Sequence, residues 1–514
     1  MTQHCNSTTF SQFMFRIFIV LIIIWQSGCT KVGPDFQLPV QSPPTTWSQE
    51  ENDLFKSPSQ PDSVAWWEHF NDPLLNTLIR TAYEQNLTLR TAAIRILESR
   101  AQLARVRGNI YPQSQNINGN IFTTGTPETG ADRYFNSIST GFDVAWEMDF
   151  WGKFRRSIES ADANLMVSMA DYEDLLVSLT AEVARTYVDI RTVQERIKLA
   201  QTNAELQEKS LRLVTLQFEA GVVTELDILQ AKTLLYSTLT TIPSFEATLA
   251  TYINSLGVLL GMMPEEVSLL IQPEGNVPDF TSQVALTIPA QLLRRRPDIR
   301  RSEMAAAAQS EQIGIARTEL LPSFTLFGSI GWSADDAGSN SLDDLFDSNS
   351  FSYNFGPGFT WSVFNYGRLK NEVRIQDARF QQAVIRYQET VLNAAREVED
   401  AMQSLVHSRK EAELLKKSVE TSRRSAELSM LQYTEGLADY QRVLDSIRAV
   451  TQKEDQYAQT TGKIANFTIA LYKAFGGGWN ISEKEPYLPD EVRDEMESRT
   501  DWGTLLSPVP TATE

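Results

Sequence analysis

The sequence predicts a mainly α-helical fold with a membrane β-barrel, in which one structural unit occurs twice. A glycine-containing turn between long helical patterns is found at residues 217–224 and again at 432–439, which is 215 residues later (432 − 217 = 215). Apolar residues recur every seven positions before each turn, a spacing typical of coiled coils. Apolar and polar residues alternate in two segments before each heptad pattern, as in strands. Each unit is therefore expected to hold two β-strands and a long coiled-coil helical hairpin.

Composition argues against several functional classes. The chain has 514 residues and a formal net charge of −19, so nucleic acid is not an expected partner. Its two cysteines, Cys5 and Cys29, both lie near the N-terminus, and its three histidines are far apart. We therefore expect no disulfide framework, no metal site and no acid–base cluster. No nucleophile–base pattern supports the alternative of an exported hydrolase, and neither an enzyme nor a cofactor is predicted.

The N-terminus predicts export and lipidation. Arg16 precedes an apolar run at 17–25, which is shorter than the roughly 20 residues of a transmembrane helix. With the small residues that follow, residues 1–28 are typical of a signal peptide. The sequence Gln-Ser-Gly-Cys ending at Cys29 resembles a bacterial lipobox, so Cys29 is the predicted lipid-bearing residue and new N-terminus. The alternative is an ordinary signal peptide with an incidental cysteine. Thr30, where an Asp would favour the inner membrane, favours the outer membrane.

Residues 29–65 are rich in Pro, Ser, Thr and Gln, which predicts an extended tether with little structure of its own. Asp72-Pro73 then gives an N-cap followed by Pro at the first helical position. From there we expect one helix running to about residue 108.

The alternating segments are placed at about 113–149 in the first unit and about 323–364 in the second. In the stretch 137–149, Phe142 and Trp146 fall on one apolar side, and polar residues fill the other side. Each strand has about the 9–11 residues that cross a membrane. A soluble β-domain is the alternative. Four strands are too few to close a barrel, so a spanning protein would have to oligomerise, and three copies would give twelve strands.

The heptad patterns predict two very long helices. In the first unit the helix would run over about 152–217, roughly 100 Å at 1.5 Å per residue. The heptad positions are Met169, Leu176, Val183, Ile190, Ile197, Ala204 and Leu211, and then Val384, Val391, Val398, Leu405, Ala412, Val419 and Ala426. Return helices should follow the turns, and Pro243 should break or bend the first of them.

Several short stretches occur in order along the chain. They are CTKVGPDF at 29–36, WWEHFNDP at 66–73, RRPDIR at 295–300, and the two turns. Together they resemble the outer-membrane factor family, in its lipoprotein (NodT-type) branch of TolC-like channels from RND-type tripartite efflux systems. The resemblance implies a trimer with a 12-stranded β-barrel in the outer membrane, continued by a 12-helix α-barrel through the periplasm.

The family resemblance also implies function and partners. The chain would passively conduct substrates to the exterior from a periplasmic adaptor (membrane fusion protein) and an inner-membrane RND-type pump, and it would contact outer-membrane lipid. By position, the hairpin tips would contact the adaptor. The tip residues are Gly221, Val222, Val223, Gly436, Leu437 and Ala438.

The resemblance further implies a periplasmic gate. Asp445 and Arg448 match the family's Leu-Asp-x-x-Arg pattern, and their spacing puts them on one helical face. In a threefold assembly, Asp445 would form a ring that suits cations, and its salt links would hold the gate shut. Gln441 stands one turn earlier, where some relatives have an apolar constriction. The first-unit equivalents, Gln230 and Thr233, are uncharged. The alternative is a solvated helix pair worth about 0.3–0.5 kcal/mol.

These interpretations divide the chain as follows: a signal peptide (1–28), a lipidated tether (29–65), the first repeat (66–263), an equatorial linker (264–288), the second repeat (289–478), and an equatorial segment with a disordered tail (479–514). Two other functions stay open. One is a structural coiled-coil envelope lipoprotein without a pore, and the other is the exit duct of a type I secretion system. The sequence does not identify the cargo.

Overall fold

The computed structural model describes most of the chain as two compact units. The described residues are 31–37, 46–49, 52–56, 65–126, 133–271, 275–278, 284–285, 296–336, 341–478 and 488–506. The predicted signal peptide and Cys29 lie outside them. One unit takes its residues from 1–40, 97–167 and 302–387, and the other from 41–96, 168–301 and 388–514. Each unit therefore combines segments from both repeats.

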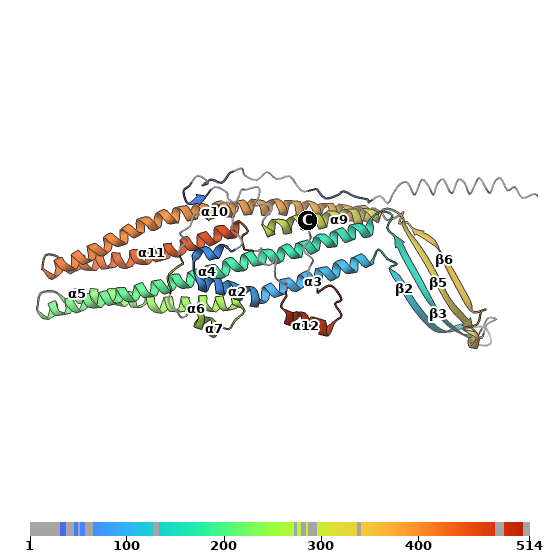
Figure 1. Ribbon diagram of the computed structural model, residues 1–514, viewed down its shortest axis with the longest axis horizontal. Helices are drawn as coiled ribbons and strands as arrows, with labels where there is room; N and C mark the ends of the chain where they lie inside the picture. The colour runs from blue at the N-terminus through green and yellow to red at the C-terminus, as the bar shows by residue number, and fades with distance from the viewer. Residues whose placement is uncertain are drawn as a thin grey trace, which may run out of the picture. The chain divides into compact units, whose positions relative to one another are not determined.

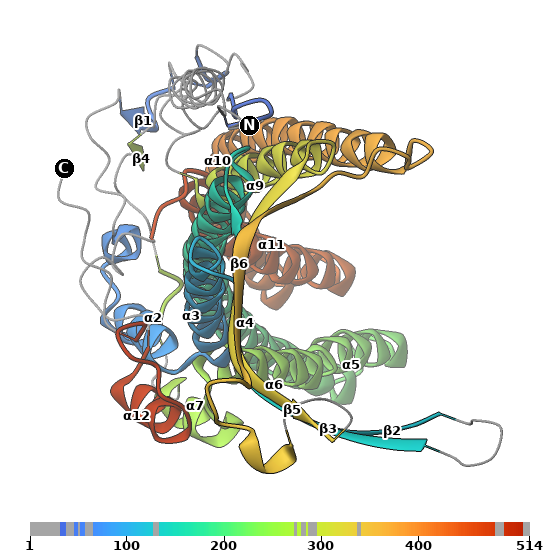
Figure 2. The same cartoon turned by 90° about the vertical axis from the view of Figure 1, so that its right-hand side faces the viewer.

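The first of these units contains an antiparallel sheet built from both repeats. Its strands are β2 (Ser114–Thr126), β3 (Arg133–Met148), β5 (Ser323–Asp335) and β6 (Phe351–Thr360), in the order β2-β3-β5-β6. Figures 1 and 2 show the strands side by side in one curved sheet. The boundary between the repeats is the β3–β5 pair, so the two copies share one continuous ladder.

One row of side chains crosses all four strands. Ile117 is paired with Phe142, Phe142 with Ile330, and Ile330 with Tyr353. All four side chains are exposed. Directly paired residues point to the same face of a sheet, so this face carries an apolar row that the chain itself leaves uncovered.

The helix predicted from residue 73 to about residue 108 is in fact two helices. α2 (Pro73–Gln85) and α3 (Leu87–Gly108) are separated by Asn86, whose backbone is extended (φ −63°, ψ 121°). Its Oδ1 accepts the Leu89 N–H at 2.8 Å, and its Nδ2 donates to the Leu259 carbonyl at 2.9 Å. Asn86 therefore caps α3 and also joins this junction to a distant helix. The prediction of one helix was wrong because the helical period continues through the break.

Each strand pair is followed by a helix of 67 residues, α4 (Lys153–Glu219) and α10 (Arg368–Thr434). The predicted heptad positions face inward along most of both helices. Those that are buried are Leu176, Val183, Ile190, Ala204, Val384, Val391, Val398, Leu405, Val419 and Ala426. Met169, Ile197, Leu211 and Ala412 are half-buried. The seven-residue repeat thus marks a packing seam, as coiled-coil geometry requires.

The two return helices differ in continuity. The first is divided into α5 (Glu225–Leu239) and α6 (Thr241–Leu260), as Pro243 predicts, because proline cannot donate to the carbonyl four residues earlier. Near the break, side-chain hydroxyls donate to backbone carbonyls at 2.7–2.8 Å; the donors are Ser237, Thr240 and Thr241. The second return helix, α11 (Tyr440–Ala474), is continuous.

Parts of the predicted tether pack against the helices, which corrects the expectation of little structure. Trp47 is buried, and the Ser48 N–H donates to the Glu399 carboxylate of α10 at 3.0 Å. β1 (Phe55–Lys56) pairs in parallel with β4 (Val284–Ala285). The composition of the tether is that of a linker, but within its described parts the apolar residues Trp47 and Phe55 are buried.

Short elements complete the described part of the chain. They are the 3-10 helices η1 (Trp66–Phe70) and η2 (Leu342–Asp344), and the helices α7 (Pro264–Ile271), α9 (Pro297–Thr318) and α12 (Asp490–Arg499). The predicted disordered end, from residue 507 on, lies outside the described residues. No single described helix is long and apolar enough to cross a membrane. Residues 225–260 and α7 reach the required length and hydropathy only when taken together, and the two are bent by 110° relative to each other.

Candidate functional site

The two hairpin tips have the same backbone geometry. Gly221 and Gly436 each have φ +74°, a left-handed conformation that strains any residue with a Cβ. After the first glycine, the Val222 N–H donates to the Gln217 carbonyl at 2.9 Å. After the second, the Leu437 N–H donates to the Gln432 carbonyl at 2.7 Å. These bonds close each long helix with a Schellman-type turn, so both tips are defined loops.

Each tip presents one apolar side chain to solvent. Val222 is 70% exposed and Leu437 is 77% exposed. The residues that follow them, Val223 and Ala438, are half-buried, and Val223 packs against the core beneath the tips. Each tip therefore has one apolar side chain exposed to solvent and a following residue that is half-buried.

Beneath the tips, the two hairpins share one apolar core. Its buried members are Val214, Ala231, Leu234, Tyr433, Tyr440, Val443, Leu444 and Ile447. They come from α4, α5, α10 and α11, so side chains of both hairpins pack in a single cluster. Tyr433 and Tyr440 are not among the predicted site residues. The signal in the sequence that could have identified them is an aromatic residue on each side of the second tip.

The two tyrosines are buried in different ways. Their rings lie 5.2 Å apart. The Tyr440 hydroxyl is hydrogen-bonded to the Ser210 hydroxyl at 2.9 Å, whereas the Tyr433 hydroxyl has no hydrogen-bond partner within the described part of the chain. Burial raises the pKa of Tyr433 to about 12, and the Asp227 carboxylate acts in the same direction. Tyr433 is therefore a neutral phenol at physiological pH.

This difference predicts opposite effects of removing the two hydroxyls. Tyr440→Phe should lower the free energy of unfolding by about 1 kcal/mol, because it leaves Ser210 without its partner. Tyr433→Phe should leave stability unchanged or raise it by up to about 1 kcal/mol, because a buried hydroxyl without a partner is unfavourable. Thermal unfolding of the two variants in parallel checks this. An equal loss of stability in both would contradict the assignment of Tyr433 as unpaired.

The predicted gate residues form one hydrogen-bonded group on the exposed side of α11. Gln441 Nε2 donates to Asp445 Oδ1 at 3.1 Å, and Arg448 Nη1 donates to the same oxygen at 3.3 Å. All three side chains are exposed. Among the described residues, the side-chain bonds of this group all stay within its own helix. Its worth is therefore the roughly 0.3–0.5 kcal/mol of a surface pair, and its charges remain available to a partner.

Gln441 and Arg448 border the opposite hairpin. With Leu444 they line a hollow of about 280 Å³ whose other wall is α5, formed by Leu226, Leu229, Gln230 and Thr233. Gln230 and Thr233, the uncharged equivalents of Asp445 and Arg448, thus line the same hollow as Arg448. The duplicated positions meet at the same level of the two hairpins.

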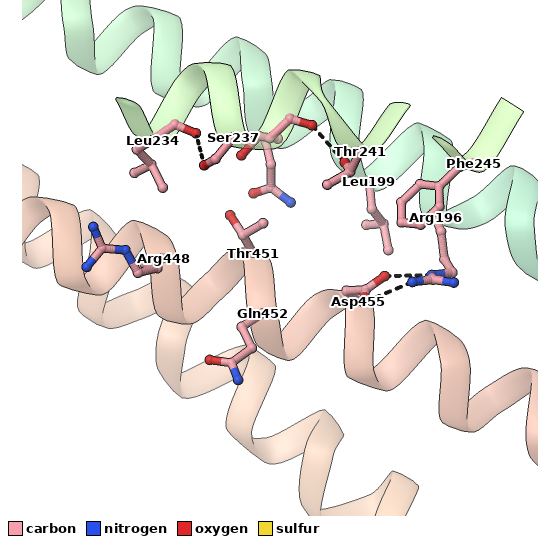
Figure 3. A pocket seen from close by; sticks show the side chains of 13 residues that line it. Arg196, Leu199, Leu234, Ser237, Thr241, Phe245, Arg448, Thr451, Gln452 and Asp455 are labelled. Atoms are coloured by element: carbon pink, nitrogen blue, oxygen red, sulfur yellow. Dashed lines mark hydrogen bonds and ion pairs between the residues drawn. The ribbon is translucent and has the colours of Figure 1, made fainter. Parts of the chain in front are cut away.

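A second set of charged residues, missed at the sequence level, joins the two hairpins. Arg196 of α4 donates to Asp455 of α11 through Nε at 2.6 Å and Nη2 at 3.3 Å. The Arg196 guanidinium also lies 4.2 Å from the centre of the Phe245 ring. Figure 3 shows these three residues at one end of a hollow of about 340 Å³, with Arg448 and Leu234 at the other end.

A buried carboxylate, that of Glu454, links three helices in the same region. Glu454 of α11 is buried and accepts from Arg423 of α10 at 2.6 Å and from Asn203 of α4 at 2.8 Å. Three helices therefore converge on one carboxylate. Among the described residues, no group of three or more His, Cys, Asp or Glu side chains could hold a metal ion.

Comparison with known proteins identifies the family. The sequence model described as outer membrane efflux protein matches residues 78–262 and 288–477, which is most of both repeats. The chain belongs to the outer membrane efflux protein family. Members of this family are efflux channels rather than enzymes, and the protein is accordingly a channel of the bacterial outer membrane with the TolC-like fold.

Individual relatives extend over nearly the whole length of this outer membrane efflux protein. It is 28% identical over 455 residues to nodulation protein T of Rhizobium leguminosarum bv. trifolii, covering 88% of this chain and 95% of that one. It is 27% identical over 473 residues to the probable outer membrane lipoprotein SilC of Salmonella typhimurium, covering 91% and 99%. The solved structure of the outer-membrane channel OprN superimposes with a TM-score of 0.81 at 31% identity, covering 87% of this chain and 99% of OprN.

Proposed function

We propose that this protein is the trimeric exit duct of a tripartite efflux pump, passively conducting substrates from a periplasmic adaptor and an inner-membrane RND-type pump to the exterior. The observation that carries the proposal is the open sheet. Among the described strands, β2 and β6 each pair on one side only, and an unpaired edge is not tolerated in lipid. Three copies supply twelve strands, enough to close a barrel. On this proposal the protein is not an enzyme.

The apolar row across the sheet supports a membrane-facing wall. A coiled-coil lipoprotein without a pore would account for the heptads of α4 and α10 but leave the exposed row Ile117, Phe142, Ile330 and Tyr353 unexplained. A duct for type I secretion would use the same architecture. The transporter that co-purifies with the native complex separates that alternative from an RND-type pump.

We propose three sites within this duct. Cys29 carries the covalent lipid, supported by the lipobox-like sequence and by the resemblance to a probable outer membrane lipoprotein. The tips dock the adaptor, supported by the exposure of Val222 and Leu437 above a firm core. The third site is the gate, formed by Gln441, Asp445 and Arg448 of α11. It is supported by the exposed charges of Asp445 and Arg448 and by the absence, among the contacts described above, of a partner outside their own helix.

Single-channel recording in a planar lipid bilayer tests the duct and the gate together. The wild-type protein should give discrete conductance steps, and their absence would contradict a pore. The double variant Asp445→Ala, Arg448→Ala should raise the conductance by about twofold or more, because it removes the charges that narrow the periplasmic end.

A matched control is available on the neighbouring helix. Arg424 and Glu427 of α10 have the same spacing, a 2.9 Å ion pair and similar exposure. Replacing both by Ala should leave the conductance unchanged. A conductance that is equal in the gate variant and the wild type would refute the gate.

A further inference from the structure

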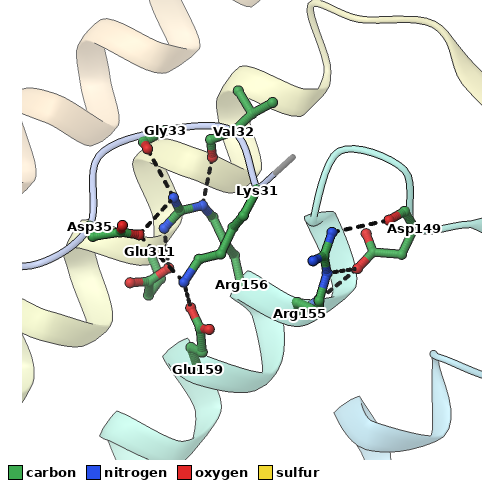
Figure 4. A network of polar contacts seen from close by, with 9 residues as sticks. All are labelled: Lys31, Val32, Gly33, Asp35, Asp149, Arg155, Arg156, Glu159 and Glu311. Carbon is green, nitrogen blue, oxygen red and sulfur yellow. Dashed lines mark hydrogen bonds and ion pairs between the residues drawn. The ribbon is translucent and has the colours of Figure 1, made fainter. Parts of the chain in front are cut away.

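The first described residues of the chain bind to a buried arginine. Arg156 of α4 is 0% exposed. Its Nε donates to the Val32 carbonyl at 2.6 Å and its Nη2 to the Gly33 carbonyl at 3.0 Å. Its Nη1 donates to Glu311 of α9 at 2.5 Å. Figure 4 shows the N-terminal segment crossing these helices, with the guanidinium directed at its backbone. We call residues 31–37 the anchor segment.

Further contacts fix the anchor segment at the end of a strand. The Val32 N–H donates to the Trp151 carbonyl at 3.0 Å, three residues after β3 ends at Met148. Lys31 forms an ion pair with Glu159. The segment therefore has backbone and side-chain bonds to the turn and first helical residues that follow β3.

The backbone approach between the segment and the helices requires glycine on both sides. Gly33 has φ +107°, and a Cβ there would lie 2.6 Å from the Gly314 Cα. A Cβ on Gly314 would lie 2.0 Å from Arg156 Cδ. Distances below 3.0 Å are not tolerated between such atoms. The fit is thus specific to this segment lying beside this arginine.

The second repeat has no such arrangement. The position equivalent to Arg156 is Asn371 (371 − 156 = 215). The turn glycine before it is retained, as Gly152 with φ +81° and Gly367 with φ +83°. The repeat thus needs the glycine to fold in both copies, whereas the arginine occurs only where an N-terminal segment lies.

We propose that Arg156 is a positioning residue for the lipid anchor, holding the anchor segment so that the acylated residue emerges beside the end of β3. The proposal rests on the proposed lipidation of Cys29. Lys31 follows Cys29 with only Thr30 between them, and two residue steps span at most about 7 Å. The acyl chains therefore enter the membrane next to the strands of the same chain.

Hydrogen exchange of the full-length protein in lipid nanodiscs tests the holding role. In Arg156→Asn, which installs the residue of the second repeat, amides of residues 31–37 should exchange about tenfold faster or more, because their local opening no longer breaks the arginine contacts. Gly33→Ala should do the same while keeping the Arg156–Glu311 pair, so it remains informative if Arg156→Asn folds poorly. Arg155→Asn removes the neighbouring charge, which bonds Asp149, and should leave exchange unchanged. Equal exchange in wild type and both test variants would overturn the proposal.

A photoreactive fatty acid incorporated during growth tests the position of the lipid. In the wild type, crosslinks from the acyl chain should map to peptides of β3, and in Arg156→Asn they should be spread over other peptides or lost. Wild-type crosslinks away from β3 would overturn the proposal even if exchange is slow. A protein that takes up no fatty acid would instead refute the lipidation of Cys29 and with it the anchor role. The exchange experiment would then still show whether Arg156 holds the segment.

Discussion

Aspartate at both hairpin tips, in the double variant Val222→Asp, Leu437→Asp, is expected to abolish efflux while leaving the channel folded. Both side chains are mostly exposed, so the folded state loses little. In an apolar contact with the adaptor, each unpaired carboxylate should cost about 2 kcal/mol or more. Two such carboxylates, together about 4 kcal/mol or more, should weaken binding at least several hundredfold. Site-specific crosslinking to the adaptor and growth in the presence of an exported toxin measure the two consequences.

The control for the tip variant is an aspartate at an equally exposed leucine far from the tips. Leu414 of α10 is 68% exposed, and Leu414→Asp should leave crosslinking and efflux at wild-type levels. Normal crosslinking in the double tip variant would show that the adaptor contacts another surface. Lost crosslinking together with a lower thermal unfolding temperature would indicate misfolding. The single variants Val222→Asp and Leu437→Asp would then separate the loss of folding from the loss of binding.

A methyl group at Gly462 should destabilise the protein strongly. This glycine lies where α11 crosses α4, and a Cβ there would be 2.3 Å from Thr192 Oγ1 and 2.9 Å from Thr192 Cγ2. The helices would have to separate or Thr192 would have to leave its rotamer, so Gly462→Ala should lower the free energy of unfolding by about 1–3 kcal/mol. Thermal unfolding in detergent gives the measurement.

Thr192→Ala should restore much of that stability in the double variant, because it removes both clashing atoms. Gly108→Ala is a matched control, since a Cβ at this residue of α3 meets nothing within 4 Å. A Gly462→Ala protein as stable as the control would mean that the helices do not pack this closely in solution.

The repeated architecture could be predicted because its signals are local and periodic. Alternation placed the strands, seven-residue spacing placed the long helices, and Pro243 placed the break in the first return helix. The division at Asn86 escaped because the capping side chain sits inside an unbroken helical period. The local sequence pattern is thus sufficient to predict the helices and strands, but not the point at which one helix is divided from the next.

The candidate site was predictable only in part. The tip glycines are visible as a repeat, and the gate residues are implied by the family resemblance. The Arg196–Asp455 pair joins residues 259 positions apart, and nothing in either helix alone distinguishes these charges from solvated ones. Likewise, Arg156 resembles any helical arginine until the N-terminal segment is placed against it. Contacts of this kind depend on the fold and carry no sequence signal of their own.

The break at Thr240 gives the two hairpins unequal mechanical properties. In α5–α6, Pro243 has no N–H to donate to the carbonyl four residues earlier, and the helix is interrupted at Thr240. α11 has an uninterrupted backbone ladder over 35 residues. When a sideways force acts on the tips, the first hairpin should therefore bend more easily than the second. During an opening movement, α5–α6 would bend, whereas α11 would move as a straight helix.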